Sequence, residues 1–282
     1  MSKLSIIAIS IVSLISFVVL IVFLQIPTTK TIQGCLKTKM FQVELCPGSG
    51  QYIPLTKISK HLQKTVVLTE DSSFFQHDGF DWNSLEKNAK ETLEKRSFNK
   101  GGSTISQQLA KNLFLTKEKT LTRKFFEFLI TWKIERVLSK RDILERYLNV
   151  VEFGKNLYGV KAAASFYFQK SAADLSVVES AFLASLLPSP VKYSKSFFQK
   201  DLSPFLRSRI GRIIKDLFQY QRITPDEYEV AVNEFNSFLN PSGASNGLAL
   251  DIDSPSEDIF ATDSANVEEE ESTDEEELDL DN

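Results

Sequence analysis

The chain has 282 residues, of which 42% are hydrophobic and 25% charged, so it is long enough to bury the core of one large or two small domains. It contains only two Cys, two His and two Met. This scarcity excludes a disulfide scaffold, a zinc-finger array and an iron–sulfur protein. Any catalysis must therefore depend on carboxylates, Lys and Arg.

Charge is distributed unevenly along the chain. Residues 251–282 contain 15 of the 37 acidic residues and no Lys or Arg, which leaves 22 acids against 33 bases in residues 1–250, a net charge of about +11. We expect residues 241–282 to be a disordered acidic tail, which is either a solvated appendage or an arm that docks on a basic surface. The basic remainder favours anionic headgroups, pyrophosphates or nucleic acid as partners.

Residues 4–24 carry no charge and are mostly Ile, Leu, Val, Phe, Ala and Ser. As a helix they would span about 31 Å, enough to cross the hydrocarbon core of a bilayer. No small-residue cleavage site follows this segment, which favours an uncleaved anchor over a signal peptide.

The residues around the anchor give conflicting signals about its orientation. Only Lys3 precedes it, whereas Lys30, Lys37 and Lys39 follow closely, and this count favours a cytoplasmic body. Cys35 and Cys46, spaced by a short polar loop, instead suggest one disulfide in an oxidising compartment. A disulfide and two unpaired thiols remain open alternatives.

Beyond a juxtamembrane segment at 25–52, residues 53–240 are predicted to form one mainly helical domain. No sustained alternation of polar and apolar residues indicates a sheet, so the expected fold class is all-α. Apolar residues recur at helical spacing, with prolines at the breaks, in 121–138, 143–151, 162–168, 177–187 and 206–218.

The segment Gly101-Gly102-Ser103-Thr104 has the composition of an anion-binding turn that opens a helix. On that helix Gln108, Lys111 and Asn112 would share one face, which suits a phosphate-bearing sugar. A Walker A loop is absent from the sequence, which disfavours nucleotide hydrolysis. Glu70 and Glu127 could supply the pair of carboxylates that glycosyl chemistry requires, although composition alone does not bring them together.

Four motifs follow one another along the chain: Glu-Asp-x-x-Phe-x-x-His-x-Gly at 70–79, Gly-Gly-Ser-Thr-Ile-Ser-Gln-Gln-x-x-Lys-Asn at 101–112, Arg-Lys-x-x-Glu at 123–127 and Ile-Leu-Glu-x-Tyr-Leu-Asn at 143–149. Together they resemble the motifs of the glycosyltransferase family 51 peptidoglycan transglycosylases, most closely the monofunctional biosynthetic kind. The resemblance extends over about residues 54–217.

This resemblance implies a lysozyme-like helical lobe with a smaller apolar jaw at the membrane, preceded by one transmembrane helix. It implies an inverting polymerase that transfers the lipid-linked glycan chain onto the 4-hydroxyl of lipid II and releases undecaprenyl pyrophosphate. Lipid II presents its sugars outside the bacterial cytoplasmic membrane, so the resemblance places the catalytic domain on the periplasmic or extracellular side and residues 1–3 in the cytoplasm. The implied partners are lipid II, the growing strand, the membrane and other cell-wall synthesis proteins, with no nucleic acid.

The resemblance also implies roles for individual residues. Glu70 would be the general base, and Glu127 would lie at the donor side. The leaving pyrophosphate would be neutralised by Lys111, Lys119, Arg123 and Lys124, with Lys119 standing where some members of the family have Arg. The cleft would be lined by Asp71, Phe74, Ser103, Gln108 and Asn112. Glu145 and Asn149 would brace the cleft, while Tyr147 and Leu148 would lie in the core.

Several alternatives follow from the same residues. A divalent cation, Mg²⁺ or Mn²⁺, could assist pyrophosphate departure, but no ligand cluster with metal-binding spacing is seen and no ligands are assigned. A lysozyme-like hydrolase would share the fold and carboxylates, and a non-catalytic lipid II-binding scaffold would share the surface. A bifunctional penicillin-binding protein is not expected, because Ser-Asp-Asn and Lys-Thr-Gly are both missing from the sequence.

Overall fold

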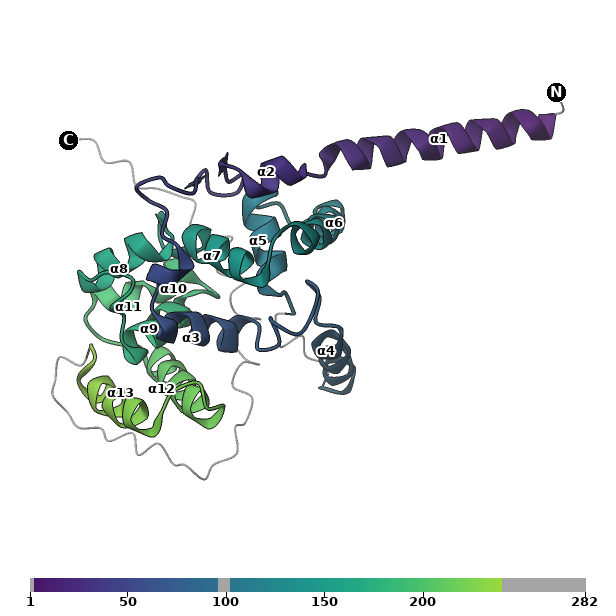
Figure 1. The fold of residues 1–282 in the computed structure, drawn as a ribbon. Coiled ribbons are helices and arrows are strands. Elements are labelled where there is room, and N and C mark those ends of the chain that lie inside the picture. Colours follow the sequence, from purple (N-terminus) through teal and green to yellow (C-terminus); the bar gives the residue numbers. More distant parts are fainter. Residues whose placement is uncertain (1–2, 96–101, 240–282) are drawn as a thin grey trace, which may run out of the picture.

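The computed structural model describes residues 3–95 and 102–239. Within them the protein is mainly helical, which confirms the expected fold class apart from two short hairpins (Figure 1). The predicted acidic tail and Gly101 lie outside the described residues. The prediction that Ser103 and Thr104 open a helix is confirmed, because Thr104 is the N-cap of helix α5.

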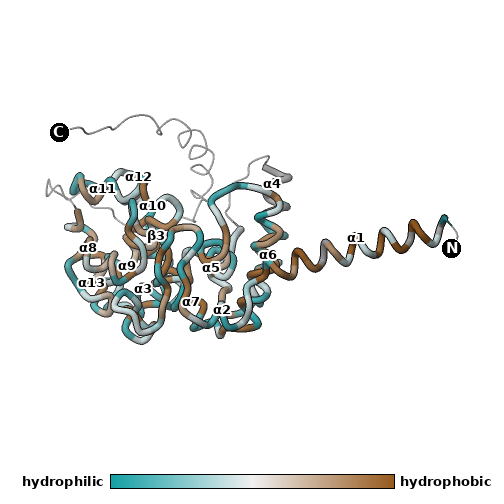
Figure 2. Tube along the Cα trace, turned by 90° about the horizontal axis from the view of Figure 1, so that it is seen from above, coloured by the Kyte–Doolittle hydropathy of each residue, from teal (hydrophilic) through white to brown (hydrophobic). Residues whose placement is uncertain are grey.

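Helix α1, Lys3–Gln25, projects away from the body as a single apolar rod (Figures 1 and 2). Its large apolar side chains are exposed to solvent, and it is the one helix among the described residues that is long and apolar enough to cross a membrane. The short helix α2, Thr29–Gln33, follows and is attached to the body, since Ile32 is fully buried. The chain therefore joins the core at Ile32, a few residues after α1 ends at Gln25.

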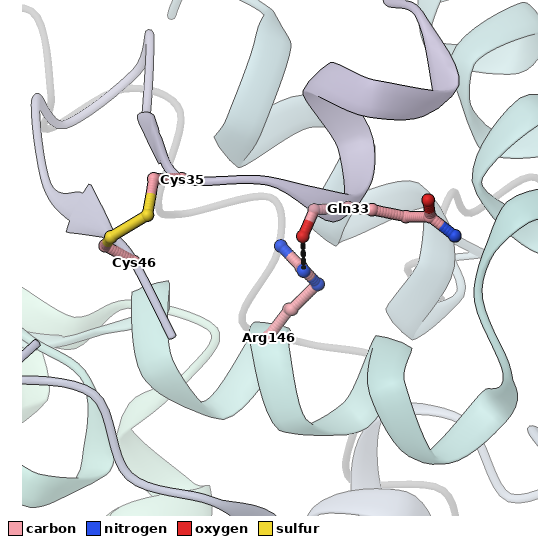
Figure 3. The surroundings of a disulfide bond; sticks show 4 residues. All are labelled: Gln33, Cys35, Cys46 and Arg146. Carbon is pink, nitrogen blue, oxygen red and sulfur yellow. Dashed lines mark hydrogen bonds between the residues drawn. A yellow bond between two sulfur atoms is a disulfide. The ribbon is translucent and has the colours of Figure 1, made fainter. Parts of the chain in front are cut away.

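A small hairpin comes next. Strands β1, Leu36–Lys37, and β2, Glu44–Leu45, pair antiparallel, and a disulfide joins Cys35 to Cys46 at their open end (Figure 3). The structure thus selects the disulfide among the two alternatives left open by the sequence. Leu45 is buried with the main core, so the core begins upstream of residue 53, the predicted start of the domain.

The remaining elements form the body, and the five helices that the sequence predicted with bounds are found to within a few residues of them. The helices and strands are η1 Leu55–Lys57, α3 Lys60–Glu70, α4 Trp82–Lys95, α5 Ile105–Phe114, α6 Leu121–Val137, α7 Lys140–Val150, β3 Glu152–Gly154, β4 Leu157–Tyr158, α8 Val160–Phe168, α9 Val177–Leu186, α10 Pro190–Tyr193, α11 Lys195–Phe198, α12 Pro204–Gln219 and α13 Pro225–Ser237.

The packing of two helices, α9 and α5, positions the residues of the site. Every residue of α9 is buried, and α9 packs against α3, α12 and α13. Helix α5 packs against both α6 and α7. Because α3 ends and α5 begins at the same part of the body, the first two sequence motifs meet there.

Helix caps explain where the predicted and observed starts differ. Helix α7 begins at Lys140, before the predicted residue 143, because Ser139 and Asp142 form a capping box. The same arrangement, with Ser176 as N-cap and Glu179 in the first turn, starts α9 at Val177, the residue predicted from the sequence. Pro225 marks the boundary between α12 and α13, as predicted for the prolines, and occupies the first turn of α13, where its missing N–H costs no hydrogen bond.

Candidate active site

Glu70 is the last residue of α3, and its carboxylate faces α5. Its Oε2 accepts a hydrogen bond from Nε2 of Gln108 at 2.9 Å. The Oε1 of Gln108 in turn accepts from the hydroxyl of Tyr147 at 3.0 Å. Because Tyr147 is fully buried on α7, this chain of hydrogen bonds fixes which end of the Gln108 amide points at Glu70.

Burial raises the pKa of Glu70 above its usual value. The hydrogen bond from Gln108 and the charges of Arg209 and Lys111 oppose this effect by favouring the carboxylate. A carboxylate that is desolvated but still ionisable is a stronger base than an exposed one, and its pKa lies closer to neutral pH. Glu70 therefore has the properties of a general base.

Asp71 follows Glu70 and ties the first motif to the start of α5. Its Oδ2 accepts from the backbone N–H of Ile105 at 3.0 Å, and its Oδ1 pairs with Nε2 of His77 at 2.8 Å. Since Nδ1 of His77 accepts from the N–H of Gly79, the imidazole proton is on Nε2, where it donates to Asp71. Asp71 is buried, so it positions α5 from beneath the site instead of lining the cleft as predicted.

Glu127, on α6, has a contrasting environment. It is buried, with 2% of its surface exposed, and both carboxylate oxygens are paired. Nη1 of Arg123 lies 2.7 Å from one oxygen, and Nζ of Lys124 lies 2.5 Å from the other. Lys124 also reaches the hydroxyl of Ser103 at 3.4 Å, which connects the turn before α5 to this cationic group.

Lys111 links the two carboxylates electrostatically. Burial lowers its pKa, while the negative charges of Glu127 and Glu70 both raise it. Arg123 and Lys124 lower it further, as expected for cations that share one small region. The charges of both carboxylates and of the two cations beside Glu127 therefore all act on Lys111.

The structure brings together Glu70, Gln108, Lys111, Ser103, Glu127, Arg123 and Lys124, all of which were predicted from the sequence. Phe74 and Asn112 are buried, with 0% and 5% of their surface exposed, so they support the site from within the core rather than line the cleft as predicted. Lys119 is exposed in the connector between α5 and α6.

The fourth motif holds the chain that leads into α3. Oε2 of Glu145 accepts from the N–H of Leu55 at 2.7 Å, and its Oε1 accepts from the hydroxyl of Tyr52. The Asn149 amide accepts from and donates to the backbone of Ile53, at 2.8 and 2.9 Å. These residues brace the body, as the sequence suggested.

Two residues near the base were not identified as functional from the sequence. Tyr147 was expected only as core, yet its hydroxyl orients Gln108. Arg209, on α12, lies outside all four motifs and lowers the pKa of Glu70. The polar hydroxyl of a motif residue could have indicated Tyr147, whereas nothing in the local sequence links Arg209 to residue 70, since only the packing of α12 against α3 brings them together.

A family model described as transglycosylase matches residues 39–216. The chain belongs to the transglycosylase family. The resemblance drawn from the four motifs is confirmed, and the matched region extends upstream of residue 54 to include the tip and second strand of the β1–β2 hairpin.

Three relatives of this transglycosylase each match the chain over most of their own length. A protein of Methylobacillus flagellatus is 42% identical over 173 residues, which is 61% of this chain and 73% of that protein. A protein of Nitrosomonas eutropha is 46% identical over 168 residues, 59% and 69% of the two chains. One from Aromatoleum aromaticum is 48% identical over 162 residues, 57% and 69%. Each is named biosynthetic peptidoglycan transglycosylase.

Proposed function

We propose that this transglycosylase polymerises peptidoglycan glycan strands, with Glu70 as general base and the cationic group around Glu127 as the site of the departing pyrophosphate. The observation that supports this division is the contrast between the two carboxylates. Glu70 is desolvated and has a raised pKa, whereas both oxygens of Glu127 are paired with cations. One carboxylate is therefore suited to take a proton, and the other to organise positive charge.

In the proposed step Glu70 takes the proton of the acceptor's 4-hydroxyl, on the N-acetylglucosamine of lipid II. The oxygen then forms a bond to the anomeric carbon of the donor N-acetylmuramic acid. The bond from that carbon to the pyrophosphate oxygen breaks with inversion, and its electron pair leaves with undecaprenyl pyrophosphate. Gln108 holds the carboxylate of Glu70 in place through its 2.9 Å hydrogen bond.

The departing pyrophosphate gains negative charge as its bond to the sugar breaks. Lys111, Arg123 and Lys124 are held in a partly buried group, where preorganised cations stabilise such charge by several kcal/mol without reorganising solvent. Lys119 in the adjacent connector would add a further cation. Glu127 holds Arg123 and Lys124 in position when no substrate is bound.

Among the described residues, no group of three or more His, Cys, Asp or Glu residues could hold a metal ion, and both oxygens of Glu127 are paired with cations. Mg²⁺ is usually held by one or two carboxylates together with substrate phosphates and water, so a Mg²⁺ or Mn²⁺ ion that assists the reaction would take most of its ligands from the pyrophosphate. Comparing rates in EDTA and in added Mg²⁺ tests this contribution.

We infer that the enzyme is anchored in the bacterial cytoplasmic membrane by α1, with its body outside. The length and apolar character of α1 support the anchor, and the Cys35–Cys46 disulfide supports an oxidising compartment, against the Lys count around the helix. Helix α6, which contacts α2 beside the anchor, carries an exposed apolar stripe that suits contact with lipid. The stripe consists of Leu121, Phe125, Phe128 and Trp132.

The test is to incubate the full chain in detergent with labelled lipid II and to separate the products on a gel. We expect a ladder of glycan chains that lysozyme digests, and no ladder with Glu70→Gln. Release of short soluble sugars instead would indicate a hydrolase. Binding of lipid II without any product would indicate a scaffold, and either result would overturn the proposal.

A further inference from the structure

The β1–β2 hairpin lies outside the four motifs, yet its tip contacts the helix that carries Gln108 and Lys111. Only two residue pairs form its ladder, Leu36 with Leu45 and Lys37 with Glu44. Two-residue strands are too short to be stable alone. The disulfide between Cys35 and Cys46 directly flanks this ladder and closes the loop (Figure 3).

The tip of the hairpin is a tight turn. The backbone N–H of Thr38 donates to the carbonyl of Val43 at 2.8 Å, and the N–H of Val43 donates to the Thr38 hydroxyl at 2.9 Å. Thr38 is fully buried, and Gln42 has a positive φ of 57°. The turn therefore presents two of the N–H groups between Thr38 and Val43, those of Lys39 and Met40, in a defined direction.

Those two N–H groups point at the last turn of α5. Lys39 donates to the carbonyl of Leu113 at 2.9 Å, and Met40 to that of Asn112 at 3.4 Å. Because α5 ends at Phe114, these carbonyls have no partner within the helix. The hairpin thus caps the C-terminal end of α5 from a distant part of the chain, next to the residue Lys111.

The hairpin tip also contacts β4 and the connector that follows α5. The ring of Phe41 lies 4.8 Å from that of Tyr158 on β4, and Nζ of Lys117 lies 5.4 Å above the Phe41 ring. Lys117 belongs to the connector between α5 and α6, which also carries Lys119. One small element therefore contacts both the end of α5 and the connector that follows it.

We propose that the disulfide-closed hairpin is a positioning element for the pyrophosphate-binding lysines: it caps α5 through Lys39 and Met40, and holds the connector through Phe41. Cys35 and Cys46 act through the hairpin and touch no substrate. Arg146 fixes the chain that leads into the hairpin, because its Nη2 donates to the carbonyl of Gln33, two residues before Cys35 (Figure 3). The proposal rests on the role of Lys111 given above.

Opening the disulfide should let the last turn of α5 fray and displace the ammonium group of Lys111. Since this group acts on the leaving pyrophosphate, kcat should fall while KM for lipid II changes little. We expect kcat to fall roughly tenfold. This is more than a weak remote coupling would cause and less than the about 100-fold loss expected when a group is fully misplaced. Phe41→Ala should lower kcat in the same direction, whereas Phe198→Ala, an exposed ring on α11, should not.

The experiment compares the oxidised full chain with the same protein reduced in place, with labelling of both thiols as proof of reduction. Hydrogen exchange at residues 109–115 should become faster on reduction, and reoxidation should restore both exchange protection and rate. In a Lys111→Ala background reduction should have little further effect on kcat. A Cys35→Ser/Cys46→Ser variant serves as a second form of the opened hairpin.

Unchanged rate and unchanged exchange after reduction would overturn the proposal. A decrease of equal factor in wild type and in Lys111→Ala would also overturn it, because the disulfide would then act on general stability. Failure of the proposed function gives a separate result, namely no glycan product from the oxidised wild type, and the exchange measurement still tests the hairpin in that case.

Discussion

The carboxylate of Asp71 accepts a hydrogen bond from the backbone N–H of Ile105 at 3.0 Å, which joins the end of α3 to the start of α5. The proposed base and the helix that carries its partners are therefore fixed to each other by a residue that does not face the substrate. In Asp71→Asn, an N–H₂ group replaces one of the two carboxylate oxygens, and it cannot accept the hydrogen bond that His77 now donates.

We expect Asp71→Asn to lower the free energy of unfolding by about 1–3 kcal/mol, the usual cost of an unsatisfied buried group, and to reduce polymerisation. The exposed neighbour Asp78 offers a matched control, since Asp78→Asn changes the same charge in the same motif. Denaturant unfolding and the lipid II assay measure the two effects. Equal stability of the two variants would show that the buried bond to α5 contributes nothing.

Glu70→Gln should abolish polymerisation, because an amide keeps the shape of the side chain but cannot accept the hydroxyl proton. It should also stabilise the protein near neutral pH. Burial raises the pKa of Glu70, so the native state binds this proton more tightly than the unfolded state, and stability falls as pH rises through the native pKa. Gln avoids that loss. Melting temperatures at several pH values should show a gain that disappears on acidification, and no gain at any pH would contradict the desolvated base.

The acidic limb of the pH–rate profile should follow the ionisation of Glu70. The hydrogen bond from Gln108 lowers the pKa of Glu70, so Gln108→Leu should raise this pKa and move the rise in kcat/KM to higher pH. The measurement is kcat/KM across the pH range for both proteins. If the acidic limb of the Gln108→Leu profile stays at the same pH, or moves to lower pH, a group other than Glu70 controls it.

Lys111→Ala and Glu127→Gln should each reduce turnover by about 100-fold or more, if each provides a few kcal/mol of transition-state stabilisation. Single changes at Arg123 or Lys124 should be milder, because both pair with the same carboxylate and can replace each other in part. Lys155→Ala, an exposed lysine in the β3–β4 turn, is the control. Near-normal kinetics for either of the first two variants would mean that the donor side has been misplaced.

The membrane-facing surface can be tested with the protein's own fluorescence. Its only two tryptophans, Trp82 and Trp132, are both exposed, at 64% and 47%, and Trp132 belongs to the apolar stripe of α6. In vesicles with brominated lipid we expect quenching of the full chain, and a smaller quenched fraction in Trp132→Phe. The Arg136 guanidinium, 3.7 Å from the Trp132 ring, would lie toward the headgroups. Emission unaffected by brominated lipid would place this face in water.

The sequence predicted what is local and repeated along the chain. Helical spacing of apolar residues located α6, α7, α8, α9 and α12, and the uncharged run located α1. The motif spacing placed Gln108 and Lys111 on one helix, which the structure confirms. The local sequence also marks the start of α7, because Ser139 and Asp142 form its capping box.

Features that depend on contacts between distant segments could not be derived in this way. The hairpin at 36–45 is too short to show a strand pattern, and its stability comes from a disulfide and from the carbonyls of α5. Phe74 and Asn112 look like exposed motif residues in the sequence, but the folded protein buries them, Phe74 in the loop after α3 and Asn112 on α5, which packs against α6 and α7. Arg209 reaches Glu70 only because α12 packs on α3.

Between the end of α1 at Gln25 and the start of α2 at Thr29 the chain has only residues 26–28. Even fully extended, they reach about 10 Å. Ile32 and the carbonyl of Gln33 are fixed to the body, so with α1 in the bilayer the proposed site is held at a set distance from the lipid surface. On the proposed function, an enzyme on so short a tether stays at the membrane while its product lengthens, so it is the strand that must move through the site as each new disaccharide is added.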